Sequence, residues 1–184
     1  MRFFYLFFSL ILPFTNQDSG IFISKGAKIT IFSSAPIEDI KAVSAQCISV
    51  YNSQTNELEF SVPIRSFQFD KALMQEHFND DYMESEKYPK ALFKGKIVEK
   101  INTKADNLYK VMVSGELTIH GVKNECKVPG TLNIKDGAIN MMADFDVKCA
   151  DYNIKIPQIA FYHIAESIKV KISANYQSIN NKSK

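Results

Sequence analysis

The side chains that could bind a metal ion are spread thinly along this chain. His120, Cys126, Cys149 and His163 carry ligand atoms that zinc prefers, yet none of them forms a close pair such as C-x-x-C or H-x-x-x-H. Three aspartates could suggest calcium, but the twelve-residue loop pattern of a calcium site is missing at Asp144, Asp146 and Asp151. The spacing therefore predicts no metal site and no metal-dependent cofactor.

The residues that could carry out catalysis are also poorly placed. The pairs Asp80-Asp81 and Glu84/Glu86 lie in or beside a helical segment, where solvation of the helix explains them. No histidine lies in a G-x-S-x-G or Cys-His setting, and the seven glycines form no phosphate-binding loop. We therefore expect no catalytic residue, no cofactor and no enzymatic activity.

Composition excludes two further classes of protein. The 184 residues are 46% hydrophobic and 23% charged, which is ordinary for a globular domain and argues against disorder. The formal charge is +2, and the lysines and arginines are scattered rather than arranged in a stripe that could neutralise phosphates. We expect no nucleic-acid partner.

The N-terminus resembles an export signal. Arg2 precedes an apolar run from Phe3 to Leu12 that only Ser9 interrupts, and this run is about half of the ~20 residues that a transmembrane helix needs. We expect a signal peptide over residues 1–17, a single domain over 18–178, a frayed tail over 179–184, and a periplasmic or secreted location. The rest of the chain has no apolar run long enough to cross a membrane, so stable insertion is not expected after the signal is removed.

The three cysteines, Cys47, Cys126 and Cys149, all lie in apolar, strand-like stretches. Because free cysteine commonly behaves as a small buried hydrophobe, three core thiols are the favoured interpretation. One disulfide with one free thiol is the alternative that the odd number leaves open.

The dominant hydrophobic period is two, which predicts strands with one buried face. Between residues 109 and 119, for example, apolar residues and Gly115 occupy the odd positions and mostly polar residues the even ones. The strand candidates share this alternation: 21–25, 27–35, 40–51, 57–69, 91–100, 108–120, 124–134, 138–149 and 166–177. Turn signals separate them at Lys25-Gly26, Asn52–Asn56, Asn102–Asn107 and Lys135-Asp136-Gly137. Such long strands favour an all-β, extended antiparallel barrel of about eight strands, closed so that no edge is left exposed.

Two irregularities interrupt the strand pattern. The apolar phase slips between Ile64 and Phe67, which predicts a bulge or bend near Arg65–Ser66. A short helical insert is expected over residues 70–84, with Asp70 as its N-cap and an apolar face that includes Leu73, Met74, His77 and Phe78. This insert would cover one end of the barrel.

Two stretches, Phe67–Ile97 and Gly115–Ile134, resemble the YceI-like family of exported lipid-binding proteins. In that family an acidic, aromatic "EHF…Y" helical stretch leads to "YP.A.F", and an "L.I.G.T"-like turn comes later. The matching residues here are Leu73, Met74, His77, Phe78, Tyr82, Tyr88, Pro89, Ala91, Phe93, Gly115, Leu117, Thr118, Gly121 and Val122. The family's usual Trp-bearing first strand and "H.G" turn are absent, since the chain has no Trp, so it resembles a divergent, short-type member.

The resemblance implies a lipocalin-like barrel whose elongated apolar interior holds a polyisoprenoid, quinone or similar long-chain lipid, without catalytic residues or metal. The residues expected to line this cavity are Phe60, Val62, Phe67, Phe69, Leu73, Phe78, Phe93, Gly95, Val113, Gly115, Leu117, Ile119 and Phe145. Those expected near the lipid headgroup are His77, Tyr82, Lys87 and His120.

An apolar ligand is also favoured by the residues themselves. The expected inward positions mix large side chains with small residues that leave room, namely Ala45, Gly95, Gly115, Ala143 and Ala174. On this basis Gly115→Phe should block lipid uptake in a folded barrel. Each buried methylene contributes ~0.8 kcal/mol, so a tail of about twenty carbons gains of order ten kcal/mol before ordering costs. The alternative is a solid-cored, non-catalytic interaction or structural barrel of the cell envelope, and a homodimer is compatible with either.

Overall fold

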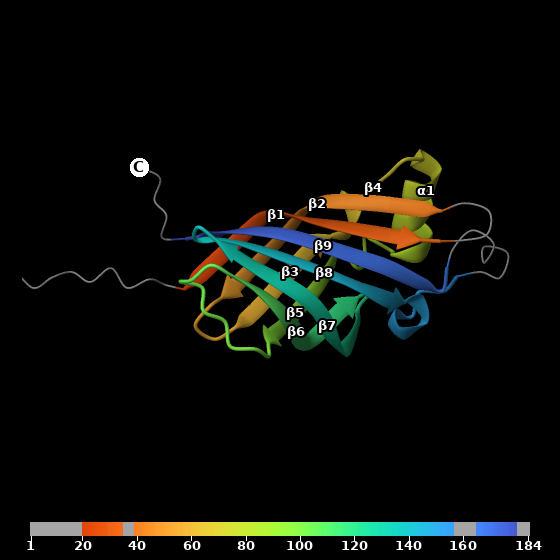
Figure 1. The fold of residues 1–184 in the computed structure, drawn as a ribbon. Coiled ribbons are helices and arrows are strands. Elements are labelled where there is room, and N and C mark those ends of the chain that lie inside the picture. Colours follow the sequence, from red (N-terminus) through yellow and green to blue (C-terminus); the bar gives the residue numbers. More distant parts are fainter. Residues whose placement is uncertain (1–19, 35–38, 157–164, 180–184) are drawn as a thin grey trace, which may run out of the picture.

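A computed structural model describes residues 20–34, 39–156 and 165–179. Eight long antiparallel strands close into a barrel, and a short helix lies at one end (Figure 1). This confirms the predicted all-β fold class. The expected signal peptide (1–17) and nearly all of the expected tail (179–184) lie outside the described residues.

The barrel wall is continuous around its circumference. Its strands follow the spatial order β1-β9-β8-β7-β6-β5-β3-β2, and β2 pairs with β1 to close the ring; β4 adds two residues beside β2. Their bounds are β1 Ile21–Ser33, β2 Ile40–Asn52, β3 Glu57–Pro63, β4 Gln68–Phe69, β5 Lys90–Ile97, β6 Asn107–Ile119, β7 Val122–Lys135, β8 Ala138–Lys148 and β9 Ser167–Ser178. Closure pairs the strand edges that an open sheet would expose.

Two tight turns join strands β6–β8. His120-Gly121 and Asp136-Gly137 each have positive φ at both residues, 51° and 75° in the first and 50° and 76° in the second. This is the geometry of two-residue hairpins, whose twist matches that of the strands they join. The Asp136-Gly137 turn was evident from the composition of the sequence, and the His120-Gly121 turn lies where the family resemblance places its "L.I.G.T"-like turn.

The hairpin predicted at Lys25-Gly26 is wrong. β1 runs through both residues with register shifts between Ser24 and Ala27 and between Ala27 and Ile29. Up to Ser24 the even-numbered residues of β1 face inward, and from Ala27 onward the odd-numbered ones do. The change occurs because Lys25 and Gly26 are both exposed and shift the alternation by one residue. The partner strand β2 has the same kind of shift, which leaves Ala45 exposed instead of inward as predicted.

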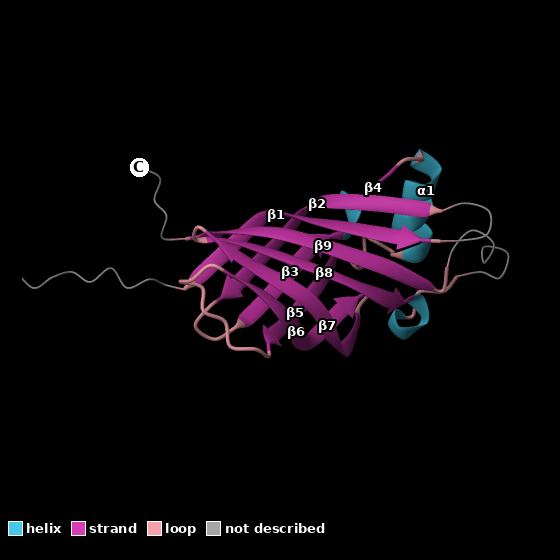
Figure 2. Ribbon diagram, in the orientation of Figure 1, coloured by secondary structure: helices cyan, strands magenta, loops and turns pink. Residues whose placement is uncertain are grey.

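The helices gather at one end of the barrel, which we call the helix end (Figure 2). The phase slip predicted near Arg65–Ser66 is a 3-10 turn, η1 (Ile64–Ser66). The insert consists of α1 (Ala72–His77), continued by a π-helical turn, η2 (Phe78–Tyr82); a further 3-10 turn, η3 (Cys149–Tyr152), follows β8. Asp70 was predicted to cap α1, but the capping position is Lys71 and no side chain bonds there.

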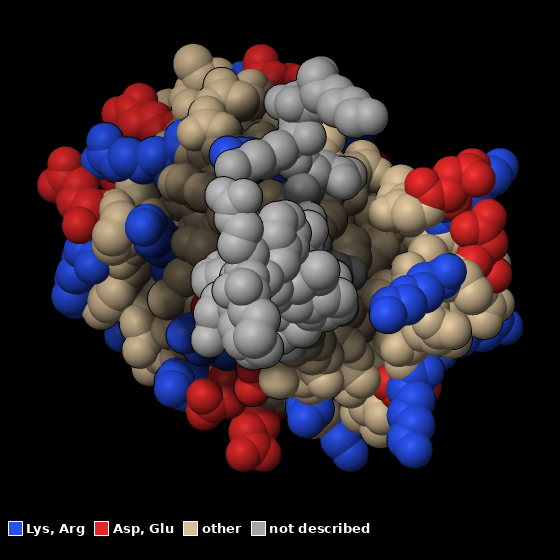
Figure 3. Space-filling model, turned by 90° about the vertical axis from the view of Figure 1, so that its left-hand side faces the viewer, with Lys and Arg blue, Asp and Glu red and all other residues tan. Residues whose placement is uncertain are grey.

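The opposite end, which we call the turn end, is packed solid. Its buried side chains come from six strands: Phe22, Tyr51, Ile97, Leu132, Ile134, Ile139 and Tyr176. The rings of Phe22 and Tyr51 lie 6.2 Å apart and those of Tyr51 and Tyr176 6.3 Å apart. Viewed from this end, Lys, Arg, Asp and Glu are interleaved on the surface rather than separated by sign (Figure 3).

Candidate functional site

A cavity of about 600 Å³ occupies the half of the barrel nearest the helix end. The period-two pattern places its walls: Val113, Leu117 and Ile119 of β6 face inward, as do Val170 and Ile172 of β9. Residues between them on the same strands, such as Glu116 and Lys171, are exposed. The alternation therefore produces an apolar lining and a charged outer surface from the same strands.

Helix α1 and turn η2 complete the cavity at the helix end. Leu73, Met74 and Phe78 line it, and the Phe78 ring lies 5.7 Å from that of Phe67 and 4.9 Å from that of Phe69. This aromatic cluster fastens the insert to the strands. Leu73 is nevertheless 62% exposed, so it borders both the cavity and the surface.

The cavity wall offers few polar partners. Among the described lining residues, polar side-chain groups belong only to Ser33, His77, Tyr82 and Cys149. Burial raises the pKa of the Cys149 thiol and of the Tyr82 hydroxyl, with the nearby Asp81 adding to the second shift. His77 Nδ1 lies 2.5 Å from Asp81 Oδ2, so the imidazole already has a carboxylate partner. Such a wall favours apolar groups over polar solutes.

The structure places eleven of the thirteen predicted lining residues on the cavity wall. They are Phe60, Val62, Phe67, Phe69, Leu73, Phe78, Phe93, Val113, Leu117, Ile119 and Phe145. That they bind a ligand stays a prediction. Ile29, Ile31, Met141, Val147 and Ile168 line the cavity but were not predicted, although the alternation in their strands was visible in the sequence.

Gly95 and Gly115 do not line the cavity. They face each other where β5 and β6 approach closely, and a Cβ on Gly115 would collide with the backbone oxygen of Lys94. A Cβ on Gly95 would meet the Phe93 ring at 2.6 Å, because that ring lies over the glycine. The expectation that Gly115→Phe leaves a folded barrel is therefore wrong: the glycine is needed for strand contact.

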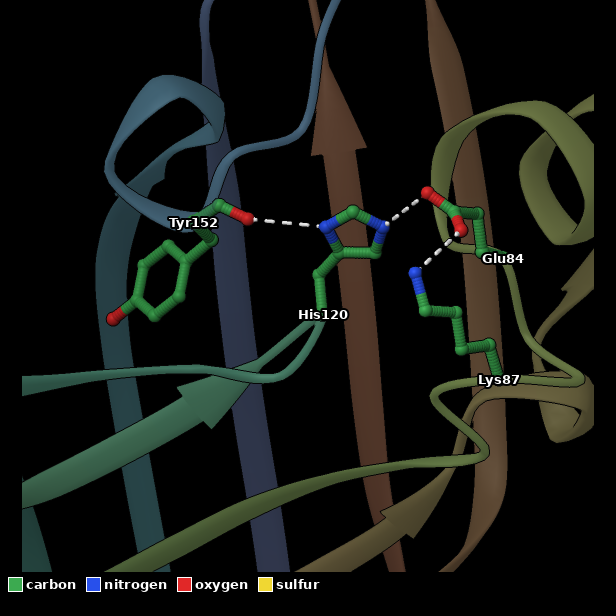
Figure 4. Close-up of polar contacts among 4 residues, drawn as sticks. All are labelled: Glu84, Lys87, His120 and Tyr152. Atoms are coloured by element: carbon green, nitrogen blue, oxygen red, sulfur yellow. Dashed lines mark hydrogen bonds and ion pairs between the residues drawn. The ribbon is translucent and has the colours of Figure 1, made fainter.

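The four predicted headgroup residues divide into two groups. His77 and Tyr82 line the cavity, whereas Lys87 and His120 do not. Instead, His120 joins two segments of the helix end: its Nε2 lies 3.0 Å from Glu84 Oε1 and its Nδ1 3.2 Å from the Tyr152 carbonyl oxygen (Figure 4). Lys87 Nζ is 3.5 Å from the other Glu84 oxygen.

The contacts among Glu84, Lys87, His120 and Tyr152 hold parts of the helix end together. The His120 side chain is only 9% exposed, and the Tyr88 ring packs against it with centroids 4.4 Å apart. The hydrogen bond from His120 is the largest cause of a lowered pKa at Glu84, and Lys87 lowers that pKa further. The cluster ties the segment after η2 to η3, and thereby fixes two elements beside the cavity.

The cysteines have the character of structural thiols. Cys47 and Cys149 are buried and Cys126 is half-buried, and all three are unbridged. Burial raises the pKa of Cys47 to about 11. Within residues 20–34, 39–156 and 165–179, no three His, Cys, Asp or Glu side chains cluster as metal ligands would, and no helix is long and apolar enough to span a membrane.

The family model that matches this chain is the YceI-like domain, over residues 24–176. The chain belongs to the YceI-like family. The match covers most of the described barrel and confirms the resemblance seen in the sequence. Comparison with curated proteins gives no significant match.

Several solved structures share the fold at low sequence identity. A polyisoprenoid binding domain from Saccharophagus degradans, implicated in plant cell wall breakdown, has a TM-score of 0.73 at 13% identity, covering 86% of this chain and 98% of that one. BcnA from Burkholderia cenocepacia has a TM-score of 0.69 at 15% identity, covering 81% and 95%. The YceI protein of Campylobacter jejuni has a TM-score of 0.54 at 19% identity, covering 95% and 97%.

Proposed function

We propose that this protein is an exported, non-catalytic lipid-binding protein that holds an isoprenoid, quinone or similar long-chain apolar ligand inside its barrel. The observation that carries the proposal is the cavity of about 600 Å³ with an almost wholly apolar wall. Pockets that bind drug-sized ligands have volumes of ~300–1,000 Å³. The volume and the wall chemistry therefore suit a lipid chain.

The energetics favour a long chain over a small polar solute. Each methylene transferred from water contributes ~0.8 kcal/mol, so twenty enclosed carbons give of order ten kcal/mol or more before ordering is subtracted. A polar solute would lose its water partners and find only Ser33, His77, Tyr82 and Cys149 among the described lining residues. His77 and Tyr82 are on α1 and η2, which supports a headgroup position at the helix end.

A solid-cored interaction barrel is the competing function, and the cavity argues against it. Only the turn end is filled by its own side chains, whereas the helix-end half has room for a guest. Export to the periplasm or the exterior is part of the proposal and rests on the apolar N-terminal run.

The proposal is tested on protein expressed from the full-length gene and purified from the exported fraction without detergent. Organic extraction followed by mass spectrometry should detect a long-chain lipid at about one per barrel. Intact-mass analysis of the same sample should show loss of the first fifteen to twenty residues. A folded, monodisperse protein that yields no lipid and takes up no added prenol would overturn the binding role in favour of the interaction barrel.

A further inference from the structure

The cavity ends abruptly halfway along the barrel. On β6, Val113 lines the cavity but the next inward residue, Val111, is buried beneath it without lining it. On β8 the same boundary falls between Met141, which lines, and Ile139, which does not. On β3, Leu58 is the second residue of the strand, at the side of the turn end, and it lines the cavity. Leu58, Val113 and Met141 thus mark the deepest level of the cavity, which we call the floor.

The layer beneath the floor is held by buried polar contacts as well as by packing. The Tyr176 hydroxyl lies 2.6 Å from Ser49 Oγ, and Ser49 in turn donates a hydrogen bond to the Glu59 carbonyl oxygen at 2.8 Å. The same hydroxyl lies 3.9 Å from Met141 Sδ, which places the floor directly on this layer. Rotating Tyr176 to admit a ligand would leave buried polar groups without partners. The layer should therefore stay closed when a chain enters.

The volume above the floor limits what can be enclosed. A protein cavity of ~150 Å³ holds one benzene molecule, or about 25 Å³ per carbon. At that density the cavity of about 600 Å³ holds roughly 24 carbons, close to five isoprene units.

Resting on the proposed function, we propose that Leu58, Val113 and Met141 select ligand length, so that the barrel encloses about five isoprene units and leaves any longer chain outside. The floor is made of side chains rather than backbone, so substitutions there should move the limit. Met→Ala and Leu→Ala each remove three heavy atoms, and Val→Phe adds four. Met141→Ala combined with Leu58→Ala should deepen the cavity by about one isoprene unit, and Val113→Phe should shorten it by nearly one.

The test is a series of all-trans prenols of three to eight isoprene units, competed against a fluorescent prenol on delipidated protein purified from the exported fraction. In the wild type, affinity should rise with each unit up to about five and then become flat. Each enclosed methylene should lower Kd by at most about fourfold. Affinity that keeps rising through eight units would refute the proposal that the floor limits ligand length, while leaving the lipid-binding function intact. If no prenol of any length binds, the floor sets no prenol length and this proposal fails, whereas the proposed lipid-binding function is decided separately by the lipid extraction described above.

The variants give the second readout. The plateau should move to about six units in the Leu58→Ala, Met141→Ala double variant and to about four in Val113→Phe. Met142→Ala is the matched control, because Met142 is the next residue on β8 and is 54% exposed on the outer face; its plateau should equal the wild type's. Val113→Phe fills space instead of creating it, so it still tests the proposal if the double variant unfolds. Unchanged plateaus in folded floor variants would overturn the assignment of these residues.

Discussion

Filling the cavity from its wall should abolish high-affinity binding without unfolding the barrel. Ala143 of β8 lines the cavity and is the smallest side chain on its described wall besides Ala91. Ala143→Phe adds six carbons, which at about 25 Å³ each occupy ~150 Å³, or about a quarter of the volume.

The expected loss of affinity follows from the displaced ligand carbons. Six carbons at ~0.8 kcal/mol give a gross loss of ~5 kcal/mol. Part of this is offset, because a chain that moves toward the helix end has fewer ordered atoms, so we expect a net loss of ~2–3 kcal/mol, or about 30–150-fold in Kd. The added ring enters empty space, so the melting temperature should stay within a few degrees of the wild type's or rise.

The assay is displacement of a fluorescent prenol, with thermal unfolding measured on the same samples. Met142→Phe is the matched control, since the neighbouring side chain points outward and is 54% exposed. A folded Ala143→Phe protein that binds the prenol as tightly as Met142→Phe would refute the reasoning, because the ligand would then lie outside the cavity.

Three further results are expected. Gly115→Ala should lower the free energy of unfolding by at least ~1–3 kcal/mol, because the added Cβ meets the backbone of β5. Gly26→Ala is the control and should change that free energy by less than ~1 kcal/mol, because the nearest atom to its Cβ is 3.5 Å away. Equal effects of the two variants in chemical denaturation would contradict the close approach of β5 and β6. Glu84 has a folded-state pKa below its ordinary 4.5, so its carboxylate stabilises the fold above that pH and loses this effect as pH falls through the lower value. Glu84→Gln should therefore lower the melting temperature at pH 7 but not at a pH well below the lowered pKa of Glu84, and a pH-independent difference would count against the contact with the histidine. Cys47, with a pKa of about 11 against 9.0, should have about 100-fold less thiolate at pH 8 and label correspondingly slowly with a disulfide reagent until the protein unfolds; rapid labelling of the native protein by mass spectrometry would rule out its burial.

The strands and the insert were predictable because local periodicity encodes them. Alternation along residues 109–119 predicted a wall strand, and the structure has β6 at Asn107–Ile119. The spacing of Leu73, Met74, His77 and Phe78 predicted a helix with an apolar face. The apolar side chains of Leu73, Met74 and Phe78 line the cavity, and the Phe78 ring also packs against Phe67. Such patterns depend on neighbours in sequence, so a single chain reveals them.

The errors arose where two strands determine one residue's environment. Lys25-Gly26 has the composition of a turn, but pairing with β2 on one side and β9 on the other keeps β1 extended and turns these residues into a bulge. Gly115 has an inward phase, yet its role is set by the Lys94 backbone on the adjacent strand. The headgroup role of His120 and Lys87 stays a prediction, and the sequence did not show their contacts, because Glu84 and Tyr152 come from segments that only the fold brings close to His120.

By itself the sequence determined the fold class, the family and eleven residues of the cavity wall, because hydrophobic alternation fixes which face of each strand turns inward. Only the tertiary structure decided how much of the interior is hollow. Volume depends on how side chains from opposite strands meet: Tyr51 and Tyr176 meet across the turn end and fill it, while the strands at the helix end carry side chains that leave about 600 Å³ between them. The depth of the cavity, and with it the length of chain it can enclose, is a property of contacts that no local pattern contains.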